Sequence, residues 1–138
     1  MTGHYEFNMD QKGRISIPAK LRSELGSKIF VSNGLGNCLK VYPESEWQKL
    51  MDKIGEQSYV AQEEFRRFFC ANSQEVSLDK QGRFCLSGEL RQYAGITDIA
   101  TIVGVGNVAE IWSKERWDEV NGKMSEEKIR ALMEQINF

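Results

Sequence analysis

Short runs in which hydrophobic and polar residues alternate recur along the chain and predict strands. The clearest are ISI at 15–17 and FCL at 84–86, where every second side chain is apolar, as in a strand with one buried face. Each run directly follows a turn that carries a glycine, Gly13 or Gly82. The pattern therefore predicts two similar turn-and-strand units at well separated places in the chain.

Each of these short strands leads into a predicted short helix. Pro18 suits the first helical position, where its missing N–H is not needed, and Ser87 can cap the equivalent helix by accepting a backbone N–H. Gly26 and Gly95 can end the two helices in the left-handed conformation. Two more strands follow each helix, and their predicted ranges are 28–32, 38–42, 99–104 and 108–112.

Apolar residues at helical spacing predict two further helices. One links the two units, and its aromatic stripe, expected to face the core, consists of Phe65, Phe68 and Phe69. The other follows Ser125, a good N-cap residue, near the C-terminus. Its apolar stripe comprises Ile129, Leu132, Met133 and Ile136. This second stripe packs either on its own domain or on a neighbouring protomer, and the sequence leaves both open.

The two units are copies of one another. DQKGR begins at Asp10 and DKQGR at Asp79, and aligning them keeps glycines, arginines and hydrophobic classes in register for about 40 positions, with one added residue. We interpret this as an internal duplication. It divides the chain into a first repeat, linking helices, a second repeat and a C-terminal amphipathic helix, at residues 3–50, 51–73, 74–120 and 121–138.

Composition narrows the class of protein. A 138-residue chain with 41% hydrophobic and 28% charged residues is typical of a compact globular protein. The stretch 99–109 is too short to cross a bilayer and the N-terminus lacks the apolar core of a secretory signal, so a cytoplasmic location is expected. Three cysteines without a CxxC pair and a single histidine, His4, argue against a disulfide framework or a metal site, and no cofactor is expected.

Charge is distributed unevenly along the chain. The net charge of −2 counts against a simple nucleic-acid binder. The window 10–22, however, holds four basic residues and one acidic residue, a local charge of +3, and the window 79–91 holds three basic and two acidic residues, a local charge of +1. Acidic residues collect near the C-terminus. The two repeated motifs therefore lie in locally cationic windows of a chain whose net charge is negative.

The repeated Asp-x-x-Gly-Arg motif has two physical interpretations. In one, Asp10 accepts backbone N–H groups, Gly13 supplies a positive φ and Arg14 is a tethered ion pair, so the motif only builds a turn. In the other, the aspartate and glycine shape the turn while Arg14 projects outward and recognises a phosphate or the edge of a guanine. The motif alone favours neither interpretation, whereas its cationic surroundings favour the second.

The order of four segments resembles the MraZ family of bacterial transcriptional regulators, which carry two SpoVT/AbrB-like domains. The segments are YEFNMDQKGRISIPAKLR, NGLGNCLKVYP, EVSLDKQGRFCLSGELRQYAGI and VGVGNVAEIWSKERW. The resemblance spans residues 3–118 and implies a mixed α/β, mainly β fold of two pseudo-symmetric swapped-hairpin β-barrel halves with flanking helices. It also implies a ring of protomers that binds promoter direct repeats of double-stranded DNA at the nucleoid and represses a cluster of division and cell-wall genes.

The resemblance also assigns roles to residues by their place in the motif. The implied DNA-contacting residues are Lys12, Arg14, Lys80, Arg83, Arg22 and Arg91, and the turn-shaping residues are Asp10, Gly13, Asp79 and Gly82. The last two arginines are conditional, since an arginine on the helix can pair with a motif aspartate instead. The second copy departs from the family pattern in Ser87, where proline is usual, and has Glu89 where the first copy has Lys20. The first hairpin is therefore expected to contribute more of the DNA binding.

Two other classes of function compete with this prediction. Asp10 and Asp79 could meet across a pseudo-twofold axis as the acid/base pair of an enzyme, but the neighbouring cations would keep both carboxylates ionised. An enzyme is therefore not expected. The alternative that stays open is an antitoxin-like protein-interaction module of the AbrB type, in which the acidic C-terminal helix binds a partner protein.

Overall fold

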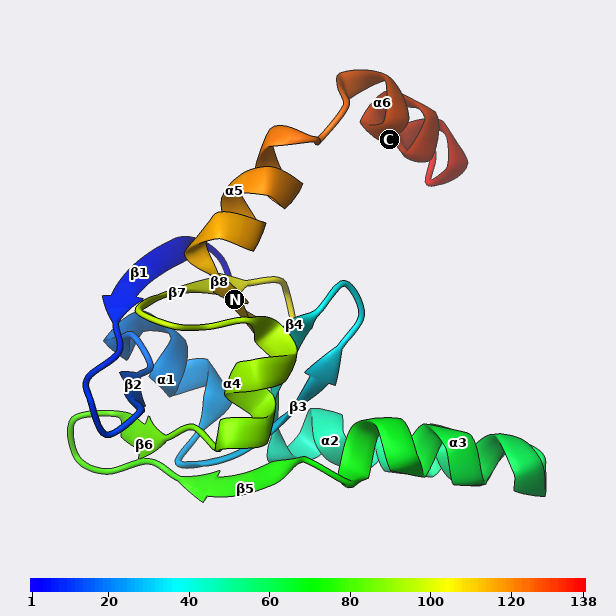
Figure 1. Cartoon of the computed structure of the whole chain (residues 1–138). Coiled ribbons are helices and arrows are strands. Elements are labelled where there is room, and N and C mark those ends of the chain that lie inside the picture. The colour runs from blue at the N-terminus through cyan, green and yellow to red at the C-terminus, as the bar shows by residue number, and fades with distance from the viewer.

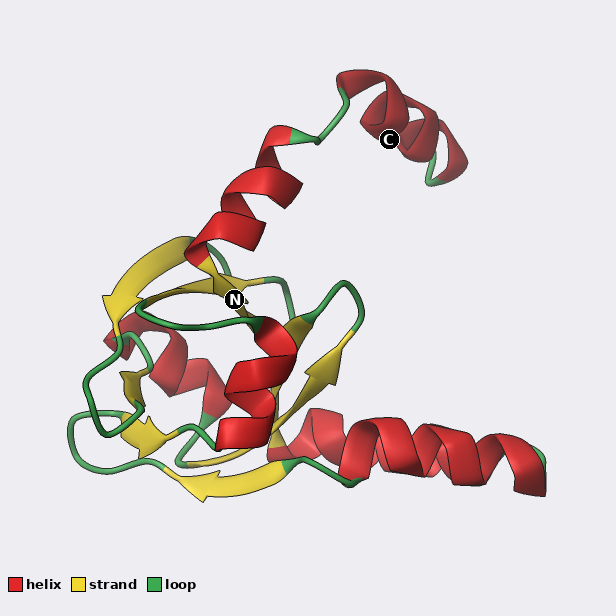
Figure 2. Ribbon diagram, in the orientation of Figure 1, coloured by secondary structure: helices red, strands yellow, loops and turns green.

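The computed structural model describes the whole chain, residues 1–138, as two repeats that share one sheet (Figure 1, Figure 2). The first repeat contains β1 (His4–Asn8), β2 (Arg14–Ser16), α1 (Ala19–Leu25), β3 (Lys28–Gly34), β4 (Cys38–Pro43) and α2 (Glu44–Gly55). α3 (Tyr59–Cys70) links it to the second repeat. The second repeat contains β5 (Gln74–Ser77), β6 (Arg83–Cys85), α4 (Gly88–Ala94), β7 (Ile99–Gly104), β8 (Ala109–Ser113) and α5 (Lys114–Gly122). α6 (Glu126–Gln135) follows.

Most residues predicted to begin or end a helix do so in the structure. Ser87 caps α4 by accepting the N–H of Leu90 at 3.3 Å, and Gly95 ends that helix in the left-handed conformation with φ +66°. Pro18 is the N-cap of α1 and not its first helical residue. Gly26 has φ +83° but ψ −178°, so the prediction of a left-handed end is wrong for α1. The helix ends instead with Gly26 in a positive-φ conformation that is essentially restricted to glycine.

A single antiparallel sheet holds six strands from both repeats, in the order β1-β7-β8-β4-β3-β5. Replacing each strand by its counterpart in the other repeat gives the same order read from the opposite edge of the sheet. A pseudo-twofold axis between β4 and β8 requires this symmetry. β1 pairs with β7 of the second repeat, and β5 pairs with β3 of the first. Each repeat therefore gives its first strand to the other, and the two repeats form one folded unit.

A mixed α/β fold with a mainly antiparallel sheet and six helices is confirmed. The strands predicted after α1 and α4 lie within two residues of their expected bounds. A closed β-barrel in each half is not found, because six strands form one shared sheet with β1 and β5 as its edges. The remaining strands, β2 and β6, pair with each other as a two-stranded ribbon.

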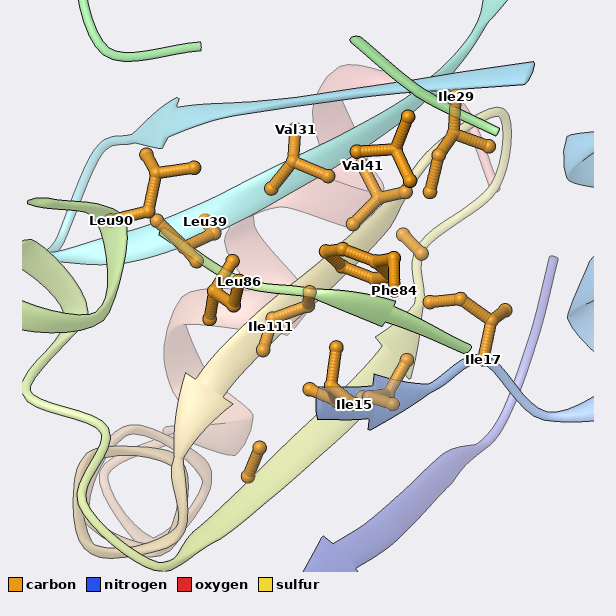
Figure 3. Close-up of a cluster of buried hydrophobic side chains, with 14 of the residues drawn as sticks. Ile15, Ile17, Ile29, Val31, Leu39, Val41, Phe84, Leu86, Leu90 and Ile111 are labelled. Atoms are coloured by element: carbon orange, nitrogen blue, oxygen red, sulfur yellow. The ribbon is translucent and has the colours of Figure 1, made fainter. Parts of the chain in front are cut away.

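The β2–β6 ribbon is held by a core to which both repeats contribute. Ile15 in β2 and Phe84 in β6 face each other across the ribbon and are 0% and 6% exposed. Figure 3 shows Phe84 between Val41 of β4 and Ile15, with Ile111 of β8 beside them. Burial of each such side chain contributes roughly 1.5–3 kcal/mol. The position of the ribbon, and of the turns that lead into it, therefore depends on packing between the repeats.

The C-terminal end of α3 is anchored to the sheet, and its N-terminal half lies beside α2, where Nε2 of Gln62 donates hydrogen bonds to the carbonyl oxygens of Gln57 and Gly55 at 2.9 and 3.3 Å. Nδ2 of Asn33 in β3 donates a hydrogen bond to the carbonyl oxygen of Phe68 at 3.2 Å, and Phe68 packs edge-on against Tyr93. Phe65 is 42% exposed, and no residue of α3 is fully buried. The prediction of a core-facing aromatic stripe is therefore wrong for Phe65, and Phe68 and Phe69 are only half-buried. The helix projects from the body of the protein instead (Figure 1).

α5 and α6 extend from the body at a different place (Figure 1). The apolar stripe of α6 is exposed, with Leu132 at 54% and Ile136 at 72%. The sequence left open whether this stripe packs on its own domain or on a neighbouring protomer. In this protomer it does not pack on its own domain. None of the helices combines the length and the apolar character needed to span a bilayer.

Candidate nucleic-acid interface

The first repeated motif folds into a tight turn closed by its own aspartate. The carbonyl oxygen of Asp10 accepts the N–H of Gly13 at 3.0 Å, and Gly13 has φ +75°. One carboxylate oxygen of Asp10, Oδ1, accepts the backbone N–H groups of Lys12 and Arg14, both at 2.9 Å. The other, Oδ2, accepts a hydrogen bond from Nε of Arg14 at 2.6 Å. The carboxylate therefore closes the turn and orients the guanidinium.

The second motif has the same geometry. Oδ1 of Asp79 accepts the N–H groups of Gln81 and Arg83 at 2.8 and 2.9 Å, and Oδ2 accepts Nε of Arg83 at 3.0 Å. The glycine of this turn again has φ +75°. The lysine is displaced by one position, since Lys12 is the second residue after its aspartate and Lys80 is the first. The two arginines are thus structurally equivalent, and the two lysines are not.

The β2–β6 ribbon brings the two turns together. It pairs Arg14 with Cys85 and Arg83 with Ser16. Two further backbone hydrogen bonds, of 2.9 and 3.0 Å, join the carbonyl of each turn glycine to the chain just past the short strand of the other repeat. Figure 1 shows both turns at one end of the molecule, away from α3 and α6. The motif cations that share this end are Lys12, Arg14, Lys80 and Arg83.

The two helix arginines lie over the turn of the opposite repeat. A Cβ atom on Gly82 would come within 2.5 Å of Cδ of Arg22, and one on Gly13 within 3.1 Å of Nη1 of Arg91. Neither arginine pairs with a motif aspartate, because the ion-pair partner of each aspartate is the arginine of its own motif. Arg22 and Arg91 therefore join the other predicted cations at this end of the molecule.

The motif aspartates are held in the ionised form. The pKa of Asp10 is lowered from its usual 3.8, first by the hydrogen bond from the backbone N–H of Arg14 and then by that from the Arg14 side chain. The backbone N–H of Arg83 is the main cause that lowers the pKa of Asp79. The hydrogen bond to Asp10 in turn raises the pKa of Arg14. Two carboxylates that both stay ionised do not share a proton, so this geometry does not support the acid/base pair of an enzyme.

Each motif arginine keeps part of its hydrogen-bonding capacity. Inside the protein the guanidinium of Arg14 donates through Nε alone, and the side chain is 37% exposed. Its two terminal nitrogens remain for an external acceptor, such as phosphate oxygens or the O6 and N7 of guanine. Because Asp10 already fixes the side chain, less conformational entropy is lost when an anion binds. The two interpretations of the motif are therefore compatible, since the aspartate builds the turn and also presents the arginine.

Alanine at Gly82 is expected to destabilise the protein more than alanine at Gly106. Both glycines have a positive φ, +75° and +89°, so an alanine is strained at either position. A methyl group at Gly106 would meet nothing within 4 Å, whereas at Gly82 it would displace the side chain of Arg22. Urea denaturation of the two variants measures the difference. Equal losses of stability would mean that Arg22 does not rest on this turn.

The aspartate hydrogen bonds are expected to make stability depend on pH in the acid range. A carboxyl with a lower pKa in the folded state stabilises the fold above its unfolded pKa of 3.8, and this stabilisation is lost as the pH falls through the lower, folded pKa. The loss covers the pH range from just above the ordinary pKa of 3.8 down to below the folded pKa. In chemical denaturation, Asp10→Asn and Asp79→Asn are expected to be less stable than the unchanged chain at about pH 6 and equally stable at the acid end of this range. A pH-independent difference would contradict the assignment.

Sequence reasoning missed how the repeats exchange parts at this site. The sequence places Arg22 close to its own motif, yet the side chain lies over Gly82 of the other repeat. The matched positions of Arg22 and Arg91 in the duplication were a signal that both serve one symmetric site. Gln81, for which the sequence pattern predicts no role, takes the turn position of Lys12, and its carbonyl oxygen accepts a hydrogen bond from the Ser16 hydroxyl at 3.1 Å.

Comparison with known proteins matches the chain to one family. A family model described as "MraZ protein, putative antitoxin-like" matches it twice, at residues 1–68 and 69–136. A protein of Syntrophomonas wolfei named "Transcriptional regulator MraZ" is 44% identical over 121 residues, which cover 86% of this chain and 85% of the relative. One of the same name from Halothermothrix orenii is 43% identical over 140 residues, which cover 99% of this chain and 98% of the relative.

Proposed function

The chain belongs to the MraZ family, and on that premise we propose that it is a sequence-specific DNA-binding regulator of transcription. Relatives that match it over nearly their whole length are named transcriptional regulators. The proposed target is a set of direct repeats in the promoter of a cluster of division and cell-wall genes. The proposed action on that promoter is repression.

The observation that carries this proposal is the meeting of two equivalent turns at one end of the molecule. Arg14 and Arg83 are both held by an aspartate through Nε, which leaves their terminal nitrogens for a ligand. A two-stranded β-ribbon fits the major groove of B-DNA, and an arginine that donates in parallel to O6 and N7 of guanine contributes about 1–3 kcal/mol of discrimination. In this proposal Arg14 and Arg83 read bases, while Lys12 and Lys80 hold phosphates.

The helix arginines add positive charge to the same surface. Arg22 lies against the second turn and Arg91 against the first, so each motif receives a cation from the other repeat. Residues 3–50 and 74–120 are then proposed as the two repeats that each supply one motif. The linking helices at 51–73 and the helix within 121–138 are proposed to lie outside the DNA-contacting surface.

Association of several protomers in a ring is the proposed source of affinity. One protomer has a net charge of −2 and offers few phosphate contacts. Identical surfaces on linked protomers bind repeated sites with an avidity that exceeds the affinity of each site. Direct repeats spaced by about one helical turn, roughly 10 bp, present the same face of the groove to successive protomers. A ring bound in this way covers the promoter and excludes RNA polymerase.

The test is binding to a labelled duplex that carries the promoter-proximal direct repeats of the protein's own gene, beside a scrambled duplex of equal length. We expect tight binding to the repeats and weak, sequence-independent binding to the scrambled duplex. The logarithm of the binding constant should fall steeply with the logarithm of salt concentration, by about 0.9 per neutralised phosphate. Equal affinity for the two duplexes would overturn the proposal.

A second candidate function is an antitoxin-like module that binds another protein. The exposed apolar stripe of α6 is the observation that favours it. This candidate predicts a stoichiometric complex with a different protein and no preference for the direct repeats. The duplex experiment therefore separates the two candidates.

A further inference from the structure

The helices α1 and α4 each begin beside the motif turn of the other repeat. The carbonyl oxygen of Gly82, in the Asp79 turn (residues 79–83), accepts the N–H of Ile17 at 2.9 Å, two residues before α1. The carbonyl oxygen of Gly13, in the Asp10 turn (residues 10–14), accepts the N–H of Leu86 at 3.0 Å, two residues before α4. Charges at the start of each helix therefore lie beside the turn of the opposite repeat.

This crossing places two extra cations beside the Asp79 turn. Lys20 and Arg22 lie in the first half of α1, Lys20 is exposed, and Arg22 rests on the turn itself. The charged residues of the turn are Asp79, Lys80 and Arg83. The turn and the start of α1 together hold four basic residues and one acidic residue, a local charge of +3.

The Asp10 turn and the start of α4 carry no net charge with the loop residue beside them. The charged residues of the turn and the helix are Asp10, Lys12, Arg14, Glu89 and Arg91. The loop residue is Asp98, whose carbonyl oxygen accepts the N–H of Met9, next to the turn, at 2.8 Å. In the corresponding place beside the Asp79 turn, the uncharged residue Ser27 accepts the N–H of Leu78 at 3.0 Å. Three basic and three acidic residues therefore cancel in this half.

Charges further from the turns do not remove this contrast. Glu24, at the far end of α1, pairs with the N-terminal amine at 3.5 Å, and Arg116, at the far end of α4, donates to the carbonyl oxygen of Tyr93 at 3.2 Å. Each helix has seven residues and is about 10 Å long, which is about one Debye length in physiological salt. Glu6 and Glu75, on β1 and β5, occupy matched positions of the two repeats, and both are ion-paired.

We propose that the Asp79 turn and the start of α1 form the main phosphate-binding half of the DNA interface, and that Lys20 is a further DNA-contacting residue in this half. The inference rests on the proposed function and distinguishes the two halves of one protomer within it. Phosphate groups flank the groove that the ribbon enters, so a cation beside a turn is placed to meet them. The half with a charge of +3 attracts the DNA backbone more strongly than the half without net charge.

The proposal reverses the ranking of the two motifs that the sequence favours. Along the chain, the first motif has the more cationic surroundings because Lys20 and Arg22 follow it. In the folded protein, the helix that carries these two cations begins beside the second motif. Arg14 keeps its proposed role, since a contact with a base edge sets discrimination between sequences, whereas a phosphate contact strengthens binding to every sequence.

Lys20→Glu tests the proposed contact directly, and it gives the first repeat the acidic residue that the second repeat has at this position. We expect weaker binding to repeat and scrambled duplexes by similar factors, at least about 5-fold in about 0.15 M salt, because a phosphate contact releases about 0.9 counterion. The salt dependence should become shallower by about 0.9. An acidic residue near a helix N-terminus is favourable, so weakening of α1 does not account for such a loss. Lys53→Glu is the control, since it changes an exposed lysine on α2 and should leave binding unchanged.

Glu89→Lys is the reciprocal variant and should strengthen binding to both duplexes, with a salt dependence steeper by about 0.9. Its matched control is Glu115→Lys. Glu89 and Glu115 are each the second residue of a helix with a serine N-cap, so both substitutions remove the same favourable charge at a helix start. Glu115 lies on α5, which extends from the body away from the turns (Figure 1), so its replacement should leave DNA binding unchanged.

A comparison within the turns ranks the two halves. Lys80→Gln and Lys12→Gln each remove one exposed lysine, and Asp10 binds only the backbone N–H of Lys12, so neither substitution opens its turn. We expect Lys80→Gln to cause the larger loss of affinity and of salt dependence. An equal or larger loss in Lys12→Gln would overturn the ranking.

The remaining outcomes separate this inference from the proposed function. If Lys20→Glu bound both duplexes as tightly as Lys53→Glu, Lys20 would lie outside the interface. If Glu89→Lys bound no more tightly than Glu115→Lys, charge would not limit the Asp10 half; either result, with the preference for the repeats intact, would overturn this inference alone. Equal affinity of the unchanged chain for the two duplexes would overturn sequence-specific regulation, yet a loss of binding to both by Lys20→Glu would still support the phosphate-binding half.

Discussion

Arg14→Ala is expected to remove most of the preference for the direct repeats. Losing a bidentate contact to guanine costs about 1–3 kcal/mol, or roughly 5- to 150-fold in affinity at each repeat contacted. Losses at two repeats multiply, so a duplex with two sites should be bound at least about 25-fold more weakly. The substitution also leaves the carboxylate of Asp10 without its cation, which adds repulsion of the DNA phosphates. Fluorescence anisotropy with repeat and scrambled duplexes measures both effects.

The control for this result is Arg67→Ala. Arg67 on α3 is 74% exposed and pairs with an acid, Glu63, at the same sequence spacing as Arg14 with Asp10, so it matches in charge and local pairing. It lies away from the turns, and its removal should leave binding unchanged. Arg14→Lys adds a second comparison, because lysine keeps the charge without the planar fork. We expect it to retain binding to the scrambled duplex and to lose discrimination. Equal binding by Arg14→Ala and Arg67→Ala would remove Arg14 from the recognition surface.

Phe84→Ala is expected to destabilise the protein by about 3–5 kcal/mol. Phe84 is 6% exposed and lies in the cluster that joins the β2–β6 ribbon to the main sheet (Figure 3). Removing its ring leaves a cavity between the two repeats, and surrounding side chains fill such a cavity only in part. A typical domain has a total stability of about 5–15 kcal/mol, so this loss is a large fraction of it. Urea denaturation followed by circular dichroism gives the change in free energy.

Cys85→Ala is the matched control for that prediction. Cys85 is the next residue in the same strand, and its side chain is exposed on the opposite face of the ribbon. Its replacement should change stability by no more than about 0.5 kcal/mol. If Phe84→Ala also fell within this range, the ribbon would not depend on the shared core. At a urea concentration near the midpoint of its unfolding, the Phe84→Ala variant should lose DNA binding by both motifs together, because one ribbon positions both turns.

The sequence alone determined the local structure of this protein. The period-two runs located the short strands, Ser87 and Gly95 bounded α4, and the Asp10–Arg14 motif predicted a turn with a positive φ at its glycine. These features depend on contacts between residues a few positions apart, such as those between Asp10 and the backbone of Arg14. The duplication was also visible, because two copies of one unit leave matched residues in the chain.

Only the tertiary structure decided which surfaces meet. A hydrophobic pattern shows that a side chain is buried but not against what, so neither the exchange of β1 and β5 between repeats nor the single shared sheet could be deduced from it. The same holds for Arg22, whose contact with Gly82 joins residues far apart in the chain. The stripes of α3 and α6 have the period of buried helices, yet Phe65 of α3 and the whole stripe of α6 are exposed, because the rest of the protomer covers α3 only in part and leaves the α6 stripe open.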